Sequence, residues 1–174
     1  MTEDSGHQPD TAVVDQPASV PAMAPVPPGG FAAGLEIRPA QGRDELAAAL
    51  QVRYEVFCVE QGVPRSEERD GRDHTGLHLI AMRDGEVLGT CRLLFTGSTV
   101  QFSRLAVTAA ARRQGIATLL LQAADVEARA AGAGRLVLHA QTYARSLYDQ
   151  AGYLSRGREF VEAGIEHIAM EKVL

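Results

Sequence analysis

The sequence predicts a mixed α/β fold, an α+β arrangement around one mixed sheet, within a chain of 174 residues. Strand-like and helix-like segments follow the order strand, helix, three strands, helix, strand, helix, two strands. Asp84-Gly85 lies between two apolar runs, which is a strong signal for a β-hairpin. The run Arg135-Leu-Val-Leu-His-Ala140 is mostly apolar, as expected for a buried parallel strand. The helix before this run therefore predicts one parallel step, from the fourth strand to the fifth.

Turn residues and periodicity place the other elements. Asp44 is positioned to cap a helix that runs to about Gln61, where Gly62 and Pro64 end it. The turn Glu162-Ala-Gly164 predicts a second hairpin near the C-terminus. The predicted strands are Leu35–Arg38, Leu77–Met82, Val87–Phe95, Thr99–Val107, Arg135–Ala140, Tyr153–Val161 and Ile165–Val173, and a short helix is predicted over Thr142–Ala151.

The helix that starts near Gly115 and ends around Gly132 to Gly134 has a clear apolar stripe. Gln122, Asp125 and Arg129 lie opposite this stripe, and Glu127 does not fit it. The predicted inward residues are Ile116, Leu119, Leu120, Ala123, Val126 and Ala130.

Composition divides the chain into two parts. Residues 1–33 are rich in proline and poor in large apolar residues, so they predict a disordered tail. Residues 34–174 are long enough to form one domain with its own core.

Charge and hydropathy exclude several partners. The formal net charge is -5 with no basic block, which argues against nucleic acid. No apolar run is long enough to cross a bilayer, so no membrane partner is predicted. The N-terminal residues lack the pattern of a secretory signal, and we expect a cytoplasmic protein. The sequence leaves the oligomeric state open, a homodimer included.

An anion site is predicted where the fourth strand passes into the long helix. Gly115 and Ala117 have little bulk, so a ligand can approach the backbone closely. The first amides of a helix lack partners and carry the positive end of its dipole, which suits a pyrophosphate. Arg112 and Arg113 would oppose that dipole unless an anion were bound. A P-loop and a Gly-x-Gly-x-x-Gly turn are both absent.

The segment Arg112-x-x-Gly115-x-Ala117 resembles the acetyl-CoA pyrophosphate loop of the GNAT family of N-acetyltransferases, Gln/Arg-x-x-Gly-x-Gly/Ala. A second segment, Gln141-Thr-Tyr-Ala144-Arg-Ser-Leu147-Tyr148-Asp-Gln-Ala-Gly152-Tyr153, is similar to the family motif after the fifth strand. Gln141 stands where the family more often has Asn. The element order is also that of the family, and the resemblance covers about residues 34–174.

This resemblance implies an acetyl-CoA-dependent N-acetyltransferase in which an acceptor amine attacks the thioester directly. In the family, the end of the fourth strand separates from the fifth and binds the pantetheine arm, and Tyr148 stands where a tyrosine protonates the departing thiolate. Acetyl-CoA is the implied co-substrate, and no metal-ligand spacing is present. The residues implied to bind it are Leu105, Ala106, Val107, Arg112, Arg113, Gln114, Gly115, Ile116, Ala117, Gln141 and Tyr148.

A closer resemblance is to the ElaA-like branch of the family. It rests on three segments, which are Arg53-x-x-Val56-Phe57-x-Val59-Glu60-Gln61, Glu67-x-x-Asp70-x-x-Asp73 followed by His78, and Glu162-x-Gly164-Ile165-x-His167-Ile168-x-Met170, together with Ala140-Gln141.

Candidate bases and acceptor-binding residues come from the same segments. Glu60, Glu67 or His78 would take the amine proton, the last of these through water. Acids spaced beside the predicted acceptor cleft suit a cationic amine, and Glu67, Asp70, Asp73 and His167 are predicted to bind it. The same acids equally fit a structural salt-bridge cluster with Arg53, Arg65, Arg69 or Arg72. A single histidine on a strand, such as His78 or His167, is more often structural.

Two other functions fit the sequence. The first is an acyl-homoserine-lactone-type synthase, which shares the fold, although this chain lacks the tryptophan usual in those enzymes. The second is a non-catalytic module that senses CoA, and Tyr148 argues against it. Small amines, polyamines, aminoglycosides and protein N-termini all fit as acceptors.

Overall fold

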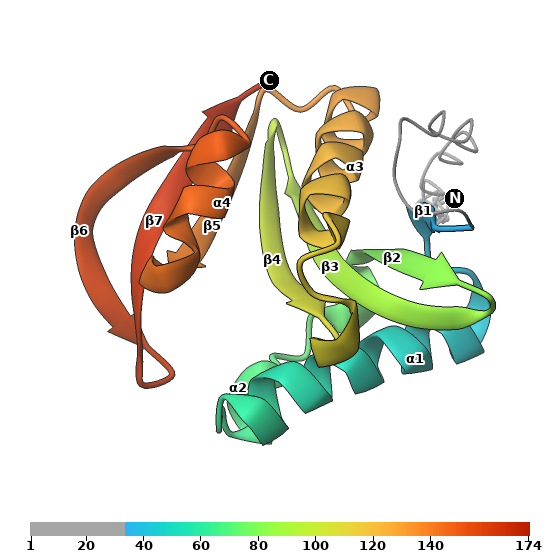
Figure 1. Cartoon of the computed structure of the whole chain (residues 1–174). Helices are drawn as coiled ribbons and strands as arrows, with labels where there is room; N and C mark the ends of the chain where they lie inside the picture. Colours follow the sequence, from blue (N-terminus) through green and yellow to red (C-terminus); the bar gives the residue numbers. More distant parts are fainter. Residues whose placement is uncertain (1–33) are drawn as a thin grey trace, which may run out of the picture.

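One mixed sheet organises the protein. The computed structural model describes residues 34–174, and the tail predicted for residues 1–33 lies outside them. Within residues 34–174 the sheet has seven strands in the order β1-β2-β3-β4-β5-β7-β6 (Figure 1). Neighbouring strands are antiparallel except β4 and β5, which are parallel. The predicted fold class, with a single parallel step, is confirmed.

The elements follow the predicted order. The two hairpins turn at Asp84-Gly85 and Ala163-Gly164, where all four residues have positive φ as a type I′ turn requires. The strands are β1 Glu36–Pro39, β2 Leu77–Arg83, β3 Glu86–Thr96, β4 Thr99–Val107, β5 Arg135–Gln141, β6 Leu154–Glu162 and β7 Ile165–Val173. The helices are α1 Gly42–Arg53, α2 Arg65–Glu68, α3 Ile116–Ala130 and α4 Arg145–Gln150, with a π-helix η1 Tyr54–Glu60 and 3-10 turns η2 Asp73–Thr75, η3 Ala109–Ala111 and η4 Thr142–Ala144.

Helices cover both faces of the sheet. Leu79 and Ala81 of β2 belong to the apolar cluster beneath α3, whereas Ile80 between them belongs to the cluster beneath α1. This alternation follows from the two-residue period of a strand. Figure 1 shows α3 and α1 on opposite sides of β2–β4. The sheet centre is therefore buried on both faces.

The first helix differs from the prediction. It was expected to continue to Gln61, but α1 ends at Arg53 and the chain continues as the π-helix η1. The predicted cap by Asp44 is wrong, because the N-cap residue is Gln41 and makes no side-chain capping bond. Glu45 instead accepts a hydrogen bond from the Gln41 backbone N–H at 2.6 Å. A π-helix and an α-helix place apolar residues at similar spacings, so periodicity alone does not separate them.

The inward face of α3 also differs. Val126 is 41% exposed and Ala130 is exposed, although both were placed in the apolar stripe. Glu127 is 6% exposed, and burial raises the pKa of its carboxyl. The buried face is rotated toward Ala124 and Ala128, because small residues allow α3 to approach the sheet closely.

Candidate functional site

A gap between β4 and β5 forms the candidate site. Only Thr99–Gln101 of β4 pair with Arg135–Val137 of β5, and the following residues Phe102–Val107 have no partner on β5. Figure 1 shows the two strands diverging beyond this point. The gap opens into a cleft of about 1020 Å³. We call β4 with η1 and α2 the N-terminal wall, and β5 with β7 and β6 the C-terminal wall.

An irregularity in β4 shapes the N-terminal wall. Ser103 pairs with Arg92 and Ala106 pairs with Thr90, so Arg104 and Leu105 stand opposite a single residue of β3. This β-bulge gives Arg104 a positive φ of 59°. Leu105 lines the cleft, while the Arg104 guanidinium donates hydrogen bonds to the backbone oxygens of Glu67 and Glu68. The bulge therefore joins β4 to α2 within the N-terminal wall and changes the direction of the unpaired edge of β4.

The N-terminus of α3 lies at the same cleft. Gly115 is the N-cap residue with φ 80°, and no side chain caps the helix. Arg113 also has a positive φ of 63°. Successive amides in such a turn, together with the open first turn of a helix, form a concave anion site. The residues present therefore fit a pyrophosphate.

The Arg112 side chain is held by contacts within the protein, unlike that of Arg113. Its Nη2 contacts both Glu60 carboxylate oxygens, at 2.9 and 2.7 Å, and its Nε donates to the Val107 carbonyl oxygen at 3.0 Å. Arg112 thus ties η1 to the end of β4. Of the two arginines predicted for the phosphates, Arg113 forms no ion pair within residues 34–174.

Tyr148 points into the cleft from α4. The residue is 7% exposed, and its ring packs edge-on against Phe102 and Tyr153, with centroids 6.4 and 6.0 Å apart. Burial raises the pKa of the Tyr148 phenol, so the hydroxyl keeps its proton at neutral pH. The hydroxyl has no hydrogen-bond partner in the described part of the chain.

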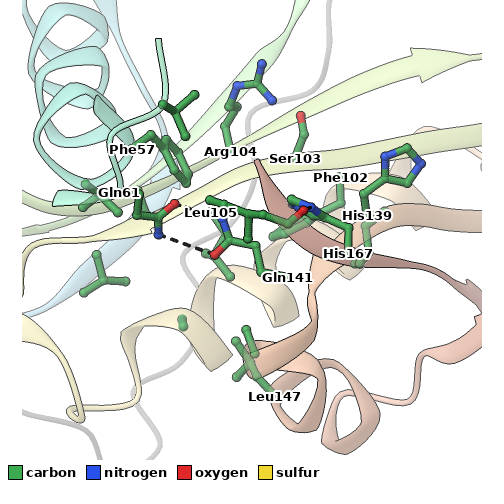
Figure 2. Close-up of a pocket in the computed structure, with 18 of the residues that line it drawn as sticks. Phe57, Gln61, Phe102, Ser103, Arg104, Leu105, His139, Gln141, Leu147 and His167 are labelled. Atoms are coloured by element: carbon green, nitrogen blue, oxygen red, sulfur yellow. Dashed lines mark hydrogen bonds between the residues drawn. The ribbon is translucent and has the colours of Figure 1, made fainter. Parts of the chain in front are cut away.

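Two glutamines connect the walls. Gln141 and Gln61 exchange hydrogen bonds across the gap (Figure 2), from Gln141 Nε2 to Gln61 Oε1 at 2.9 Å and from Gln61 Nε2 to Gln141 Oε1 at 3.4 Å. Gln61 Nε2 also donates to the Tyr143 hydroxyl at 3.2 Å. Gln141 ends β5 and Gln61 directly follows η1. The face of β5 that carries the Gln141 side chain is therefore directed toward η1.

The predicted acids of the α2 region belong mostly to a charge network. Arg53 is fully buried and contacts Glu68 at 2.5 Å and Asp73 at 2.6 Å. Arg92 is 1% exposed and contacts Asp70 at 2.6 Å and Asp73 at 2.9 Å. These hydrogen bonds lower the pKa of both Asp70 and Asp73. The network fixes α2 and η2 against β3.

Three predicted site residues lie away from the cleft. Gln114, predicted to bind the cofactor, does not line it, and its side chain accepts a hydrogen bond from Arg83 at 3.3 Å and donates one to the Ala110 carbonyl oxygen at 3.3 Å.

Asp73 does not line the cleft, because Arg53 and Arg92 hold its carboxylate inside the network. His78 is 5% exposed, with Nε2 2.9 Å from the Asp73 backbone oxygen, and burial lowers its pKa. The structure therefore does not bring His78 near the gap. Glu60, Glu67, Asp70 and His167 do line the cleft, but Glu60 is bound by Arg112.

Several cleft residues were missed by the sequence reasoning. His139 interrupts an apolar run, and that interruption was the available signal, since a polar residue there must face away from the core. Its Nδ1 lies 3.0 Å from Glu162 Oε2. Arg104 and Tyr143 gave no signal, because charged and aromatic residues are common at strand ends and in loops. Gln61 was part of a quoted motif without a role.

Residues 34–174 contain neither a side-chain cluster for a metal ion nor a helix that could span a membrane. No group of three or more His, Cys, Asp and Glu side chains in this range is arranged to hold a metal ion. None of the helices described here has the length and apolar character needed to span a membrane.

Comparisons with known proteins agree with this geometry. Residues 39–174 match the model of the acetyltransferase (GNAT) domain. The uncharacterized N-acetyltransferase YjcF of Bacillus subtilis is 31% identical over 134 residues, which cover 76% of this chain and 96% of YjcF. The crystal structure of an acyl-CoA N-acyltransferase from Pseudomonas aeruginosa has a TM-score of 0.71 and 32% identity, covering 79% of this chain and 98% of that one. Escherichia coli ElaA shares the fold, with a TM-score of 0.71 at 24% identity over 79% of this chain and 99% of ElaA.

The chain belongs to the GNAT acetyltransferase family. It is therefore an acyltransferase, in a family whose general reaction is acetyl transfer from acetyl-CoA.

Proposed function

We propose that this protein transfers an acetyl group from acetyl-CoA to the nitrogen of an amine, by direct attack of the amine on the thioester. The observation that carries the proposal is the separation of β4 from β5 after three residue pairs. It leaves the backbone of Phe102–Val107 unpaired on its β5 side inside a cleft large enough for both substrates. Holding both reactants in one cleft removes most of the entropic cost of their encounter, so no covalent enzyme intermediate is needed.

Acetyl-CoA would lie along the gap with its pyrophosphate at α3. The open amides of Ile116 and Ala117, the turn at Gly115 and the side chain of Arg113 supply the anion site. The thioester would then lie beside Leu105–Val107. Backbone N–H groups there would stabilise the oxygen that becomes negative in the transition state.

Tyr148 would donate a hydrogen bond to the departing sulfur. Its ring is fixed by Phe102 and Tyr153, and its hydroxyl is protonated and free to face a ligand. A donor held in this way interacts most strongly when charge develops on sulfur, so its effect falls on turnover and not on ground-state binding.

The acceptor would enter from the side of α2 and the C-terminal wall. Among the acids predicted to bind it, Glu67 is exposed, lines the cleft and forms no ion pair within residues 34–174. Asp70 also lines the cleft, but Arg92 neutralises it. We therefore assign Glu67 to a cationic acceptor, and Asp70 and Asp73 to the structure of the wall.

A thiol-release screen tests the proposal. The full chain is supplied with acetyl-CoA and a panel of small amines, polyamines, aminoglycosides and peptides with free N-termini. Thiol release that depends on an amine, with the acetylated amine found by mass spectrometry, is the expected result. CoA binding without turnover on any amine would contradict the proposal and favour a CoA-sensing module.

Two variants assign the parts of the site. Tyr148→Phe keeps the ring and should lower kcat by about 10²–10⁴-fold while leaving the Kd for acetyl-CoA nearly unchanged. Gly115→Val should weaken CoA binding in calorimetry, because a branched side chain at φ 80° is strained and fills the space of the pyrophosphate. Wild-type turnover in Tyr148→Phe, or wild-type affinity in Gly115→Val, would show that the corresponding part is misplaced.

A further inference from the structure

We propose that His167 is the base that takes the proton from the acceptor amine, an inference that rests on the proposed N-acetyltransferase function. Of the three bases predicted from the sequence, Glu60 and His78 are poorly placed, and Glu67 is assigned to the cationic acceptor. The Glu60 carboxylate forms an ion pair with Arg112, and His78 is buried outside the cleft. His167 lines the cleft and is 8% exposed.

The register of the C-terminal wall brings His167 to the gap. His167 of β7 is paired with Gln141 at the end of β5, so the two side chains share one face of the sheet. Gln141 uses that face to reach Gln61 across the gap. His167 is therefore one strand away from the gap, on the face from which the acceptor would enter. Figure 2 shows His167 beside Gln141 in the cleft.

The ring of His167 is held in one orientation. Its Nδ1 lies 2.8 Å from the backbone oxygen of Ile165, which can only accept a hydrogen bond. In the neutral ring the proton is therefore on Nδ1, and Nε2 carries the lone pair. Nε2 has no hydrogen-bond partner within residues 34–174. This tautomer leaves the lone pair of Nε2 available to accept a proton.

Phe160 fixes the plane of the same ring. A register shift in β6, where Gly157 has φ 74°, places Phe160 directly opposite His167. The two rings stack at 6.0 Å with an angle of 22° between their planes. Phe160 also packs edge-on against His139 at 4.9 Å. The bulge thus positions an aromatic support behind the proposed base.

During the transfer one proton leaves the acceptor nitrogen and one reaches the sulfur of CoA. The amine nitrogen forms a bond to the thioester carbonyl carbon, and Nε2 of His167 accepts the proton that this nitrogen loses. The carbon–sulfur bond then breaks, its electron pair goes to sulfur, and the Tyr148 hydroxyl protonates the thiolate. His167 returns its proton to solvent and Tyr148 regains one, so the products are the acetylated amine and CoA.

The test uses asparagine, whose side-chain nitrogen can take the place of Nδ1 and keep the bond to the Ile165 oxygen. His167→Asn should retain the melting temperature and the Kd for acetyl-CoA but lose about 10²–10⁴-fold in kcat/KM for the amine. Its kcat/KM should also lose the decline at low pH that protonation of the base causes in the wild type. The other ionisable groups that line the cleft and act on this profile are Glu60, Glu67, Glu68, Asp70, Arg104, Arg112, Arg113, His139, Tyr143, Tyr148 and Glu162.

His139→Asn is the matched control. His139 is on the same face, also has one ring nitrogen engaged, and is half-exposed. It should keep most of the activity and the low-pH decline. Wild-type kinetics in His167→Asn, or loss of the decline in His139→Asn instead, would overturn the role of His167 while leaving the proposed function intact. Absence of amine acetylation by the wild-type chain would overturn both.

Discussion

The N-terminal wall of the cleft is anchored by buried charges, whereas the C-terminal wall is held by strand pairing and stacked rings. In the first, Arg53 and Arg92 are almost completely enclosed and meet their carboxylates at 2.5 to 2.9 Å. In the second, β6 is largely exposed, and its ion pair between Arg156 and Glu171 is near the surface. The wall proposed to present backbone to the thioester is thus anchored by buried ion pairs, and the wall that carries His167 is anchored by strand pairing.

The largest expected loss of stability comes from breaking a buried ion pair that anchors the N-terminal wall. Arg53→Met keeps an unbranched side chain but removes the 2.5 Å ion pair of Glu68, whose side chain is only 2% exposed. Glu68 is then left with longer contacts alone, to Arg69 at 3.5 Å and Arg104 at 3.8 Å. Removing one member of a buried ion pair costs about 3–5 kcal/mol of unfolding free energy. Arg156→Met at the exposed pair is the control and should cost about 0–1 kcal/mol. Equal losses for the two variants in urea unfolding would mean that the walls do not differ.

Acid should destabilise the N-terminal wall in two stages. Burial lowers the folded pKa of His78 below the ordinary value, so the unfolded chain binds the proton first and stability falls as the pH drops below about 6.5. Asp70 and Asp73 also have lowered folded pKa values, so their contribution is complete above their ordinary pKa and declines below about pH 4.

His78→Gln separates the two stages. The Gln side-chain nitrogen can keep the bond to the Asp73 oxygen but does not titrate. We expect the slope of unfolding free energy against pH just below about pH 6.5 to become flatter, by at most about 1.4 kcal/mol per pH unit. An unchanged slope in this range would show that His78 is not responsible for it.

The smallest expected effect concerns the contact between the walls. A double-mutant cycle on Gln61→Ala and Gln141→Ala should give a coupling energy of about 0.5–1 kcal/mol, because the amides exchange hydrogen bonds in both directions. Chemical denaturation of the two single variants and the double variant measures it. Additivity within error would mean that the bridge adds no stability in solution.

The sequence predicted most of the backbone because its signals are local. β4 and β7 have the predicted bounds, and both predicted hairpins turn at a glycine with positive φ, Gly85 or Gly164. The phosphate turn and the position of Tyr148 at the cleft also followed from short motifs. The roles assigned to these residues stay predictions.

Features that depend on tertiary contacts were not visible in the sequence. The bulge at Arg104 and the π-helix η1 change the register without changing the apolar pattern. Arg92 was assigned no partner, because an arginine within a strand usually faces solvent and its carboxylates lie about twenty residues away. The cluster of His139, Phe160 and His167 forms only when three strands are aligned.

Only three residue pairs join β4 to β5, so a ligand in the gap adds contacts between the two strands that the protein alone does not have. A ligand that lies along both strands binds the native chain and not the unfolded one, so each rise in its concentration stabilises the protein. At 100 times its Kd such a ligand adds about 2.7 kcal/mol. Differences of about 1–2 kcal/mol change how much of a protein survives proteolysis in a cell. We therefore expect the steady-state amount of this protein to follow the supply of its co-substrate.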